Sequence, residues 1–239
     1  MTRIHLVHLY QREMNIYGDT GNRLVLEQRL RHAGIDYRVS VCGVGDPLPP
    51  DAHLLLGGGG QDVGQVVVGQ DLQGKTETLQ AMKKDNIPML MICGMYQLFG
   101  HSFRTYEGRE IAGAGLLDMH TDAQQERLIG NVTLSSDFGE LVGYENHSGL
   151  TYLHEGLLPL GRVVRGYGNN NDDHFEGAHD GSLIGTYLHG PVLAKSPGLA
   201  DHLLNLALRA AGSTASLRPV PGLDDLAVAA ASSAKARPQ

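Results

Sequence analysis

The first hundred residues alternate between short apolar runs and stretches with helical periodicity, and this alternation limits the fold more than any other feature. Parallel strands need a crossover connection, which is usually a helix. The alternation therefore predicts an α/β fold in which a mostly parallel sheet is flanked by helices on both faces. The predicted strands cover residues 3–10, 35–45, 51–57 and 88–93, and the predicted helices cover 22–33 and about 61–84.

The second half of the chain has a different pattern, with short strand candidates separated by turns and then a closing amphipathic helix over 200–212. We expect a single domain over residues 1–211. The chain beyond it is rich in Ala, Ser, Pro and Arg, which predicts a flexible C-terminal tail over 212–239 with at most a short helix at LDDLAVAA. The strand candidates of the second half are residues 128–136, 141–153, 161–168 and 182–189.

Charge and cysteine content exclude several classes of protein. The 239-residue chain has 26 acidic and 19 basic side chains, a formal net charge of −7, and no basic run, so a nucleic-acid groove is not expected. Its two cysteines, Cys42 and Cys93, end separate apolar runs, which favours free thiols in a reducing cytoplasm. No run approaches the roughly 20 apolar residues that span a bilayer, and the apolar start is too short for a signal peptide.

A cysteine stands where a predicted strand turns into a predicted helix. Cys93 ends PMLMIC and is followed by Gly94. Such a thiol is either a small buried hydrophobe or a nucleophile on a tight strand–turn–helix elbow. A nucleophile needs a base, and His189 is the best placed of the twelve histidines because it ends an apolar strand before Gly-Pro. No histidine shows a zinc-type spacing, so no metal site is predicted.

Two glycine-containing segments are candidate ligand-binding loops, and we reject one of them. GQDLQGKT, residues 69–76, matches the phosphate-loop pattern, but the surrounding apolar residues fall at helical spacing and Asp71 would repel phosphate. Lys75 is therefore predicted to lie on a helix surface. The other loop, LLLGGGGQD, follows a parallel strand and lets backbone approach a ligand closely. Beside a cysteine elbow it is a candidate oxyanion hole.

Several separated segments resemble one enzyme family. ICGMYQLFG resembles the nucleophile segment of class I glutamine amidotransferases, in the cobyric acid synthase-like branch. MNIYGDTGN, LLLGGGGQD, ERLIGN, YENHSG, GYGNNNDD and IGTYLHGPVL resemble, within that branch, the GatD family, the glutaminase subunits of lipid II isoglutaminyl synthase. The resemblance covers about residues 3–208 and implies a flavodoxin-like amidotransferase fold.

The resemblance implies a role for each matching position. Cys93 would be the nucleophile and His189 the general base. Arg127, in ERLIGN, would bind the carboxylate of L-glutamine, and Gln97 would hold the substrate or the elbow. Backbone N–H groups of Gly94 or Met95, with one from Gly58 or Gly59, would form the oxyanion hole.

The sequence departs from the family pattern at two places. Met95 stands where many class I enzymes have glycine. His189 is followed by Gly-Pro and not by the x-Glu that supplies the third triad member. The site would then work as a dyad or with Asp19 as the substitute, although Asp19 is equally well explained as a helix cap.

The resemblance also implies partners. Ammonia would pass to a MurT-like Mur ligase that activates the D-glutamate α-carboxyl of lipid II, with ATP and Mg²⁺ on that partner and no cofactor on this chain. The complex would amidate lipid II at the cytoplasmic face of the membrane. Three alternatives are an amidotransferase of a cobyrinate-type pathway, a cysteine hydrolase of the same fold, and a binding module without activity. Arg127 and Gln97 argue against the hydrolase, and the Cys93–His189 pair argues against the inactive module.

Overall fold

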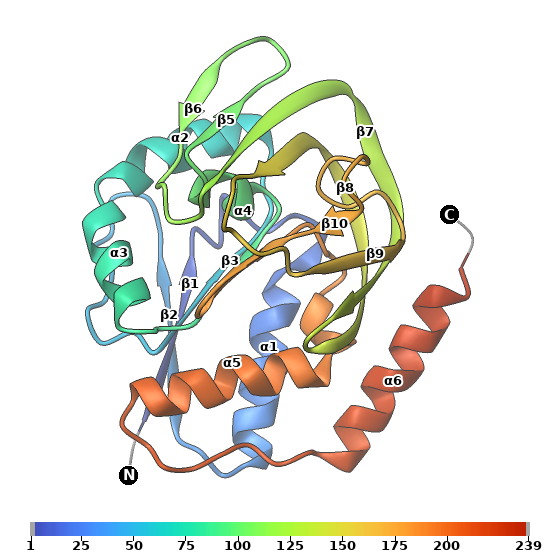
Figure 1. Cartoon of the computed structure of the whole chain (residues 1–239). Helices are drawn as coiled ribbons and strands as arrows, with labels where there is room; N and C mark the ends of the chain where they lie inside the picture. The colour runs from blue at the N-terminus through green and yellow to red at the C-terminus, as the bar shows by residue number, and fades with distance from the viewer. Residues whose placement is uncertain (1–2, 238–239) are drawn as a thin grey trace.

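A computed structural model describes residues 3–237, apart from the side chains of residues 62 and 63. Residues 1–2 of the predicted domain and 238–239 of the predicted tail lie outside the described residues. Two six-stranded sheets form the framework, and helices cover the first of them (Figure 1). Within the described range no helix combines the length and the apolar character that crossing a membrane requires.

The first sheet contains the strands predicted from the first hundred residues. Its strand order is β11-β12-β4-β3-β1-β2, and every neighbouring pair is parallel except β11 with β12. The four central strands are buried at every residue because both faces of the sheet are covered, which explains their continuous apolar sequences. The strands are β1 (Ile4–Leu9), β2 (Tyr37–Cys42), β3 (Leu54–Gly57), β4 (Met89–Ile92), β11 (Ala178–Asp180) and β12 (Leu183–Thr186).

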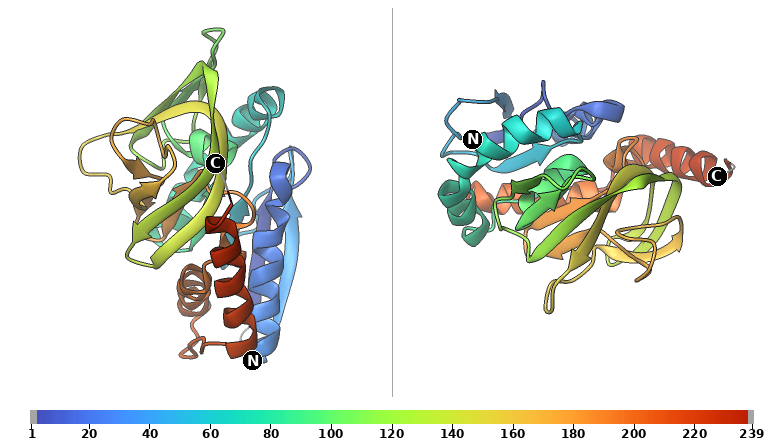
Figure 2. Two further views of the ribbon diagram at one scale, coloured as in Figure 1. Left: turned by 90° about the vertical axis from the view of Figure 1, so that its right-hand side faces the viewer. Right: turned by 90° about the horizontal axis from the view of Figure 1, so that it is seen from above.

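Helices cover both faces of this sheet. Helices α1 and α5 pack on one face, while α2 and α3, which connect β3 to β4, pack on the other (Figures 1 and 2). The short α4 follows β4 directly. The helical elements are η1 (Ile16–Gly18), α1 (Thr20–His32), α2 (Asp62–Gln73), α3 (Thr76–Lys84), α4 (Gly94–Phe99), η2 (Val192–Ala194), α5 (Pro197–Ala210) and α6 (Pro221–Lys235).

The second sheet is built around one long hairpin. Strands β7 and β8 pair in antiparallel fashion across a two-residue turn, and β7 is longer than the predicted strand because it begins at Met119. Its strand order is β10-β9-β7-β5-β6, with β8 paired to β7. The strands are β5 (Ser102–Arg104), β6 (Glu110–Ala112), β7 (Met119–Ser136), β8 (Gly139–Leu153), β9 (Gly161–Arg165) and β10 (Phe175–Glu176).

A backbone bridge joins the hairpin to the end of β12. The His189 N–H donates to the Tyr144 carbonyl at 2.8 Å, and the Tyr144 N–H donates to the His189 carbonyl at 3.2 Å. The second sheet therefore fixes the backbone of the predicted base at the carboxyl edge of the first.

Residues after 212 form more structure than the composition predicts. Helix α6 is longer than LDDLAVAA and lies beside α1 (Figure 2). Its Asp224 accepts a 2.7 Å hydrogen bond from Arg29 of α1, which also pairs with Asp201 of α5. The Arg165 side chain donates to the Lys235 carbonyl at the other end of α6. These contacts hold the helix against the domain. Composition alone cannot locate them.

The rejected phosphate loop is helical, as predicted, but Lys75 is not on the surface. Helix α2 runs through residues 69–73, so no loop forms there to wrap a phosphate. Lys75 lies between α2 and α3 and is 8% exposed. Its ammonium pairs with Asp71 and lies 5.5 Å from the centre of the Tyr10 ring. The prediction of a surface residue was wrong because Asp71 and Tyr10 provide a buried partner for the charge.

Candidate active site

Cys93 occupies a strained turn between β4 and α4. Its φ of 51° and ψ of −107° lie in a region that a non-glycine residue adopts only when its surroundings impose it. Its N–H donates to the Thr186 carbonyl at 2.8 Å, and its carbonyl accepts from the Gln97 N–H at 2.9 Å. These two bonds hold the turn, so the thiol projects from the end of the strand into a pocket.

His189 and Asp19 form a buried hydrogen-bonded pair. The Nδ1 atom of His189 lies 3.0 Å from Oδ1 of Asp19, and both side chains are 1% exposed. The second oxygen of Asp19 accepts the Gly59 N–H at 2.7 Å. Asp19 makes no capping bond to α1; that role falls to Asn15, whose Oδ1 accepts the Thr20 N–H at 2.8 Å. Its carboxylate is therefore directed at the imidazole.

The same pair is adjacent to the thiol. A Cβ on Gly59 would come within 2.8 Å of the His189 ring and 3.2 Å of the Cys93 Cβ, so only glycine fits between them. The His189 Nε2 atom has no hydrogen-bond partner among the described residues. Burial lowers the pKa of His189, but the negative charge of a Cys93 thiolate and the Asp19 carboxylate together raise it to about 10. The arrangement favours the protonated form of the His189 imidazole.

The N–H groups predicted to form the oxyanion hole differ in whether they already donate to an acceptor. The Gly59 N–H is bound by Asp19, and the Met95 N–H donates to the Gly58 carbonyl at 3.3 Å. By contrast, no acceptor among the described backbone and side-chain groups is bonded to the N–H of Gly58, and the same holds for the N–H groups of Gly94 and Gly60. The last two lie close together, because a Cβ on Gly94 would be 3.1 Å from the Gly60 nitrogen.

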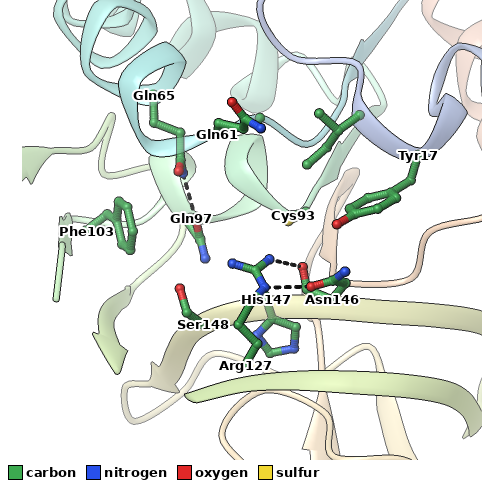
Figure 3. Close-up of a pocket in the computed structure, with 12 residues that line it drawn as sticks. Tyr17, Gln61, Gln65, Cys93, Gln97, Phe103, Arg127, Asn146, His147 and Ser148 are labelled. Carbon is green, nitrogen blue, oxygen red and sulfur yellow. Dashed lines mark hydrogen bonds between the residues drawn. The ribbon is translucent and has the colours of Figure 1, made fainter. Parts of the chain in front are cut away.

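A pocket of about 530 Å³ opens beside Cys93. Figure 3 shows Tyr17 on one side of it, Gln97 and Gln65 on the other, and the Arg127–Asn146 pair opposite the thiol. The Arg127 side chain donates from Nε to Asn146 Oδ1 at 2.7 Å and from one terminal nitrogen to the Asn146 carbonyl at 2.8 Å. Its remaining terminal nitrogen points away from Asn146 (Figure 3). The guanidinium is thus oriented and partly free for an anion.

Gln97 is fixed at both ends of its amide. Its Oε1 accepts from Gln65 Nε2 at 2.7 Å, and its Nε2 donates to the Tyr187 hydroxyl at 3.1 Å. Gln97 also lines the pocket, so one amide hydrogen can reach a bound ligand while the residue supports α4. On the opposite wall the Tyr17 ring meets the His189 ring edge-on, with centroids 4.8 Å apart.

Two fully buried carboxyl groups lie behind the site. Glu176 accepts hydrogen bonds from the Thr186 hydroxyl and the Tyr187 N–H, and Glu145 accepts from the N–H groups of Tyr167 and Gly168. Burial raises the pKa of Glu176 to about 8, reinforced by the charge of Glu145 and opposed by its hydrogen bonds. Burial thus favours the neutral form of Glu176 at the junction of the two sheets.

A family model identifies the domain. Residues 5–197 match the CobB/CobQ-like glutamine amidotransferase domain. The chain belongs to the CobB/CobQ-like glutamine amidotransferase family. Among its relatives, the GatD subunit of lipid II isoglutaminyl synthase (glutamine-hydrolyzing) from Staphylococcus aureus is 37% identical over 214 residues, 89% of this chain and 87% of that protein. The GatD subunit from Streptococcus pneumoniae is 35% identical over 211 residues, 87% and 81% of the two chains.

More distant members of the same family match less of their own length. A probable cobyric acid synthase from Methanothermobacter thermautotrophicus is 32% identical over 170 residues, which are 65% of this chain but 33% of that protein.

Among solved structures, PurLQS from Thermotoga maritima superposes with a TM-score of 0.58 at 15% identity, over 88% of this chain and 97% of that one. Solved glutamine amidotransferases superpose as well, with TM-scores of 0.54 and 0.53, so this amidotransferase has the class I glutamine amidotransferase fold.

The structure adds four residues that the sequence patterns do not single out. Gly60, Gln65, Tyr17 and Asn146 all line the pocket. Gly60 is the last glycine of the GGGG run, and Asn146 belongs to YENHSG, so weak signals exist for both. Tyr17 belongs to MNIYGDTGN and has a similar weak signal, whereas Gln65 has no local signal because its role depends on a contact with Gln97 that only the fold creates.

Proposed function

We propose that this amidotransferase is the glutaminase subunit of a lipid II isoglutaminyl synthase, which hydrolyses L-glutamine to glutamate and ammonia and delivers the ammonia to a Mur-ligase-like partner. The observation that carries the catalytic part is the buried Asp19–His189 hydrogen bond, which lies with the strained Cys93 around Gly59. The names and coverage of the two GatD relatives support the substrate pathway.

Glutamine enters with its α-carboxylate against Arg127. The pairing of the guanidinium with Asn146 holds it in place before substrate arrives, which lowers the entropy lost on binding. The side-chain amide then extends toward Cys93, with Gln97 beside it. Charge on Arg127 selects a substrate that carries a carboxylate at this distance from its amide.

Acylation uses the thiolate–imidazolium pair. The Cys93 sulfur attacks the amide carbon and forms a C–S bond, while the carbonyl electrons move to the oxygen. The N–H groups of Gly94 and Gly60 are free and adjacent and would receive this oxyanion, with the N–H of Gly58 as a further free donor. The predicted donors Gly59 and Met95 already have acceptors. His189 gives its Nε2 proton to the leaving nitrogen, the C–N bond breaks, and ammonia departs.

Deacylation uses the same groups, with His189 now acting first as a base. Neutral His189 takes a proton from water, the hydroxide attacks the thioester carbon, and collapse of the intermediate releases glutamate and the thiolate. Asp19 keeps the ring oriented through Nδ1 in both steps, as the acid does in a catalytic triad. Asp19 thus takes the place of the x-Glu that is missing after His189.

The ammonia acceptor would be activated elsewhere. We propose that a MurT-like ligase binds ATP and Mg²⁺, activates the D-glutamate α-carboxyl of lipid II, and forms a heterodimer with this chain at the cytoplasmic face of the membrane. Support comes from the GatD relatives, which are named as subunits of such a synthase. A stable complex would keep ammonia from escaping between the two sites.

The first test measures glutamate release from L-glutamine by the purified chain and its variants. Cys93→Ser should abolish release because a hydroxyl is a far weaker nucleophile, while Cys42→Ser, at the other and buried thiol, should retain it. Release by Cys93→Ser at near the original rate would overturn the glutaminase proposal.

The second test addresses the partner. The chain is co-expressed with a Mur-ligase-like protein from the same genome, purified through a tag on one of them, and assayed for lipid II amidation with glutamine, ATP and Mg²⁺. We expect copurification and glutamine-dependent amidation that Cys93→Ser removes. Glutaminase activity without any pairing would instead favour a cobyrinate-type acceptor, the second candidate supported by the family match.

A further inference from the structure

Three side chains with metal-binding atoms converge on the surface away from the glutaminase pocket. We propose that His101, Asp118 and His154 form a Zn²⁺ site that joins the end of α4 to the base of the β7–β8 hairpin. One ligand atom from each lies within 4.8 Å of the other two. None of the three lines the pocket beside Cys93.

The donor atoms of the two histidines already lie close to the same oxygen of Asp118. Asp118 Oδ1 lies 2.9 Å from His101 Nε2 and 2.7 Å from His154 Nδ1. In a tetrahedral zinc site two ligand atoms are about 3.3 Å apart, so an opening of about half an ångström makes room for the ion. The side chains are 52%, 58% and 41% exposed in chain order, which leaves an entry path and a coordination position for water.

The backbone holds the three segments together without any ion. The His101 N–H donates to the Met119 carbonyl at 2.8 Å, and the His154 N–H donates to the Asp118 carbonyl at 2.9 Å. His101 directly follows the last turn of α4, while Asp118 and His154 flank the paired ends of β7 and β8. A preformed backbone means that binding need not order a loop.

A fourth side chain sets the tautomer of His154. His120 Nδ1 lies 2.9 Å from His154 Nε2, on the opposite side of that ring from Asp118. The His120 ring also stacks on Tyr152, with centroids 5.3 Å apart, which limits its movement. A histidine that binds metal through one nitrogen normally donates its other N–H to such an acceptor. His120 is thus a positioning residue and not a ligand.

The donor set selects the type of ion. Two imidazoles and one carboxylate suit Zn²⁺, which accepts nitrogen and oxygen in a four-coordinate site with water as the fourth ligand. Mg²⁺ and Ca²⁺ prefer all-oxygen sites and should bind poorly. The sequence predicts no metal because 16 residues separate His101 from Asp118 and 35 separate Asp118 from His154, which matches no short zinc pattern.

The test uses chain without a histidine tag and with the Cys93→Ser change, because a catalytic thiol beside His189 also attracts zinc. Titration with ZnCl₂ against a chromophoric chelator should give one site per chain. His154→Ala and Asp118→Asn should each weaken binding by more than tenfold, and His120→Ala by less. His32→Ala, which removes an exposed histidine from α1, is the matched control and should change nothing.

A second readout locates the ion and does not depend on variants. Hydrogen exchange with and without ZnCl₂ should slow at residues 100–104, 117–121 and 152–155, while MgCl₂ has no effect. No zinc site above the level of the His154→Ala protein, or protection only around residue 189, would overturn the proposal. Equal affinity in the His32→Ala and His154→Ala proteins would also overturn it.

Discussion

Asp19 connects the His189 imidazole to the glycine loop through its two carboxylate oxygens. One oxygen accepts from the His189 ring and the other from the Gly59 N–H, and both side chains are almost fully buried. The bond fixes which ring nitrogen faces Cys93. A neutral side chain of the same shape would keep the contact but remove the charge that stabilises imidazolium.

We therefore expect Asp19→Asn to lower kcat for glutamine hydrolysis by about 10²–10⁴-fold with a much smaller change in KM, as for the loss of a triad acid. Steady-state kinetics with circular dichroism would measure this. Asp36→Asn, which changes an exposed carboxylate paired with Arg3, is the control. A kcat within threefold of the original would mean that Cys93 and His189 act as a dyad.

The charge of Cys93 also acts on His189. Because a thiolate is one cause of the raised pKa of His189, Cys93→Ser should bring that pKa down from about 10 toward the usual imidazole value. Nitrogen-15 NMR titration of the imidazole would follow the change. Iodoacetamide alkylation of the original protein, followed against pH, provides an independent view of the same pair. An unchanged His189 titration in Cys93→Ser would contradict the ion pair.

Arg127 is exposed, which limits the effect of its removal. Losing a charge-assisted hydrogen bond to a carboxylate costs about 1.5 kcal/mol at a solvated site, or about tenfold in KM. Arg127→Ala should raise KM by about that factor and leave the rate of Cys93 alkylation unchanged. Asn146→Ala should do the same more weakly, because it only orients the guanidinium. Unaltered glutamine kinetics in both variants would refute this assignment.

At the scale of elements, α6 is tied to the domain but is remote from the chemistry. Arg29 pairs with Asp224 of α6, yet it retains Asp201 of α5 when α6 is absent. The pocket beside Cys93 contains no residue of α6.

Removing residues 220–239 should thus cost about 1–2 kcal/mol, or about 3–8 °C in Tm, with kcat unchanged. Calorimetry and the glutaminase assay on the shortened chain would test both expectations. Asp224→Asn should reproduce a smaller part of the loss in Tm. A collapse of kcat on truncation would show that the domain does not end near residue 211.

The sequence predicts elements whose signals are local and misses arrangements that depend on distant contacts. Apolar runs between helical stretches are enough to predict β1, β3 and β4, because a strand covered on both faces has little choice of composition. The same runs do not reveal that β7 and β8 form one long hairpin. The Cys93 elbow is visible from its neighbours, whereas the bond between Asp19 and His189 joins residues 170 positions apart.

At the scale of the whole molecule, the buried carboxyl group of Glu176 at the junction between the sheets makes stability depend on pH. Glu176 belongs to the second sheet, and its carboxyl group bonds to Thr186 and Tyr187 at the end of the first. Its pKa is about 8 in the folded chain against an ordinary value of 4.5. Between these values the folded state holds a proton that the unfolded state has lost, so stability falls as pH rises from about 4.5 to 8.

Glu176→Gln should flatten this part of the stability profile. The original protein should lose on the order of a few kcal/mol across the range relative to the variant, because glutamine keeps the shape but does not ionise. Urea unfolding at a series of pH values would measure it, with Glu155→Gln at an exposed site as the control. Parallel profiles for Glu176→Gln and the original protein would show that Glu176 is ionised when folded.

The bridge between Tyr144 and His189 has a consequence for the order in which the chain is made. A nascent chain that has reached residue 153 contains the elbow, the glycine loop, Asp19 and the β7–β8 hairpin, but it lacks His189. His189 is made after both strands of the hairpin, and its backbone then pairs with an edge that is already present. Ribosome-bound fragments that stop before residue 189 should therefore present the cysteine without consuming glutamine, and turnover should begin only once the chain extends past His189.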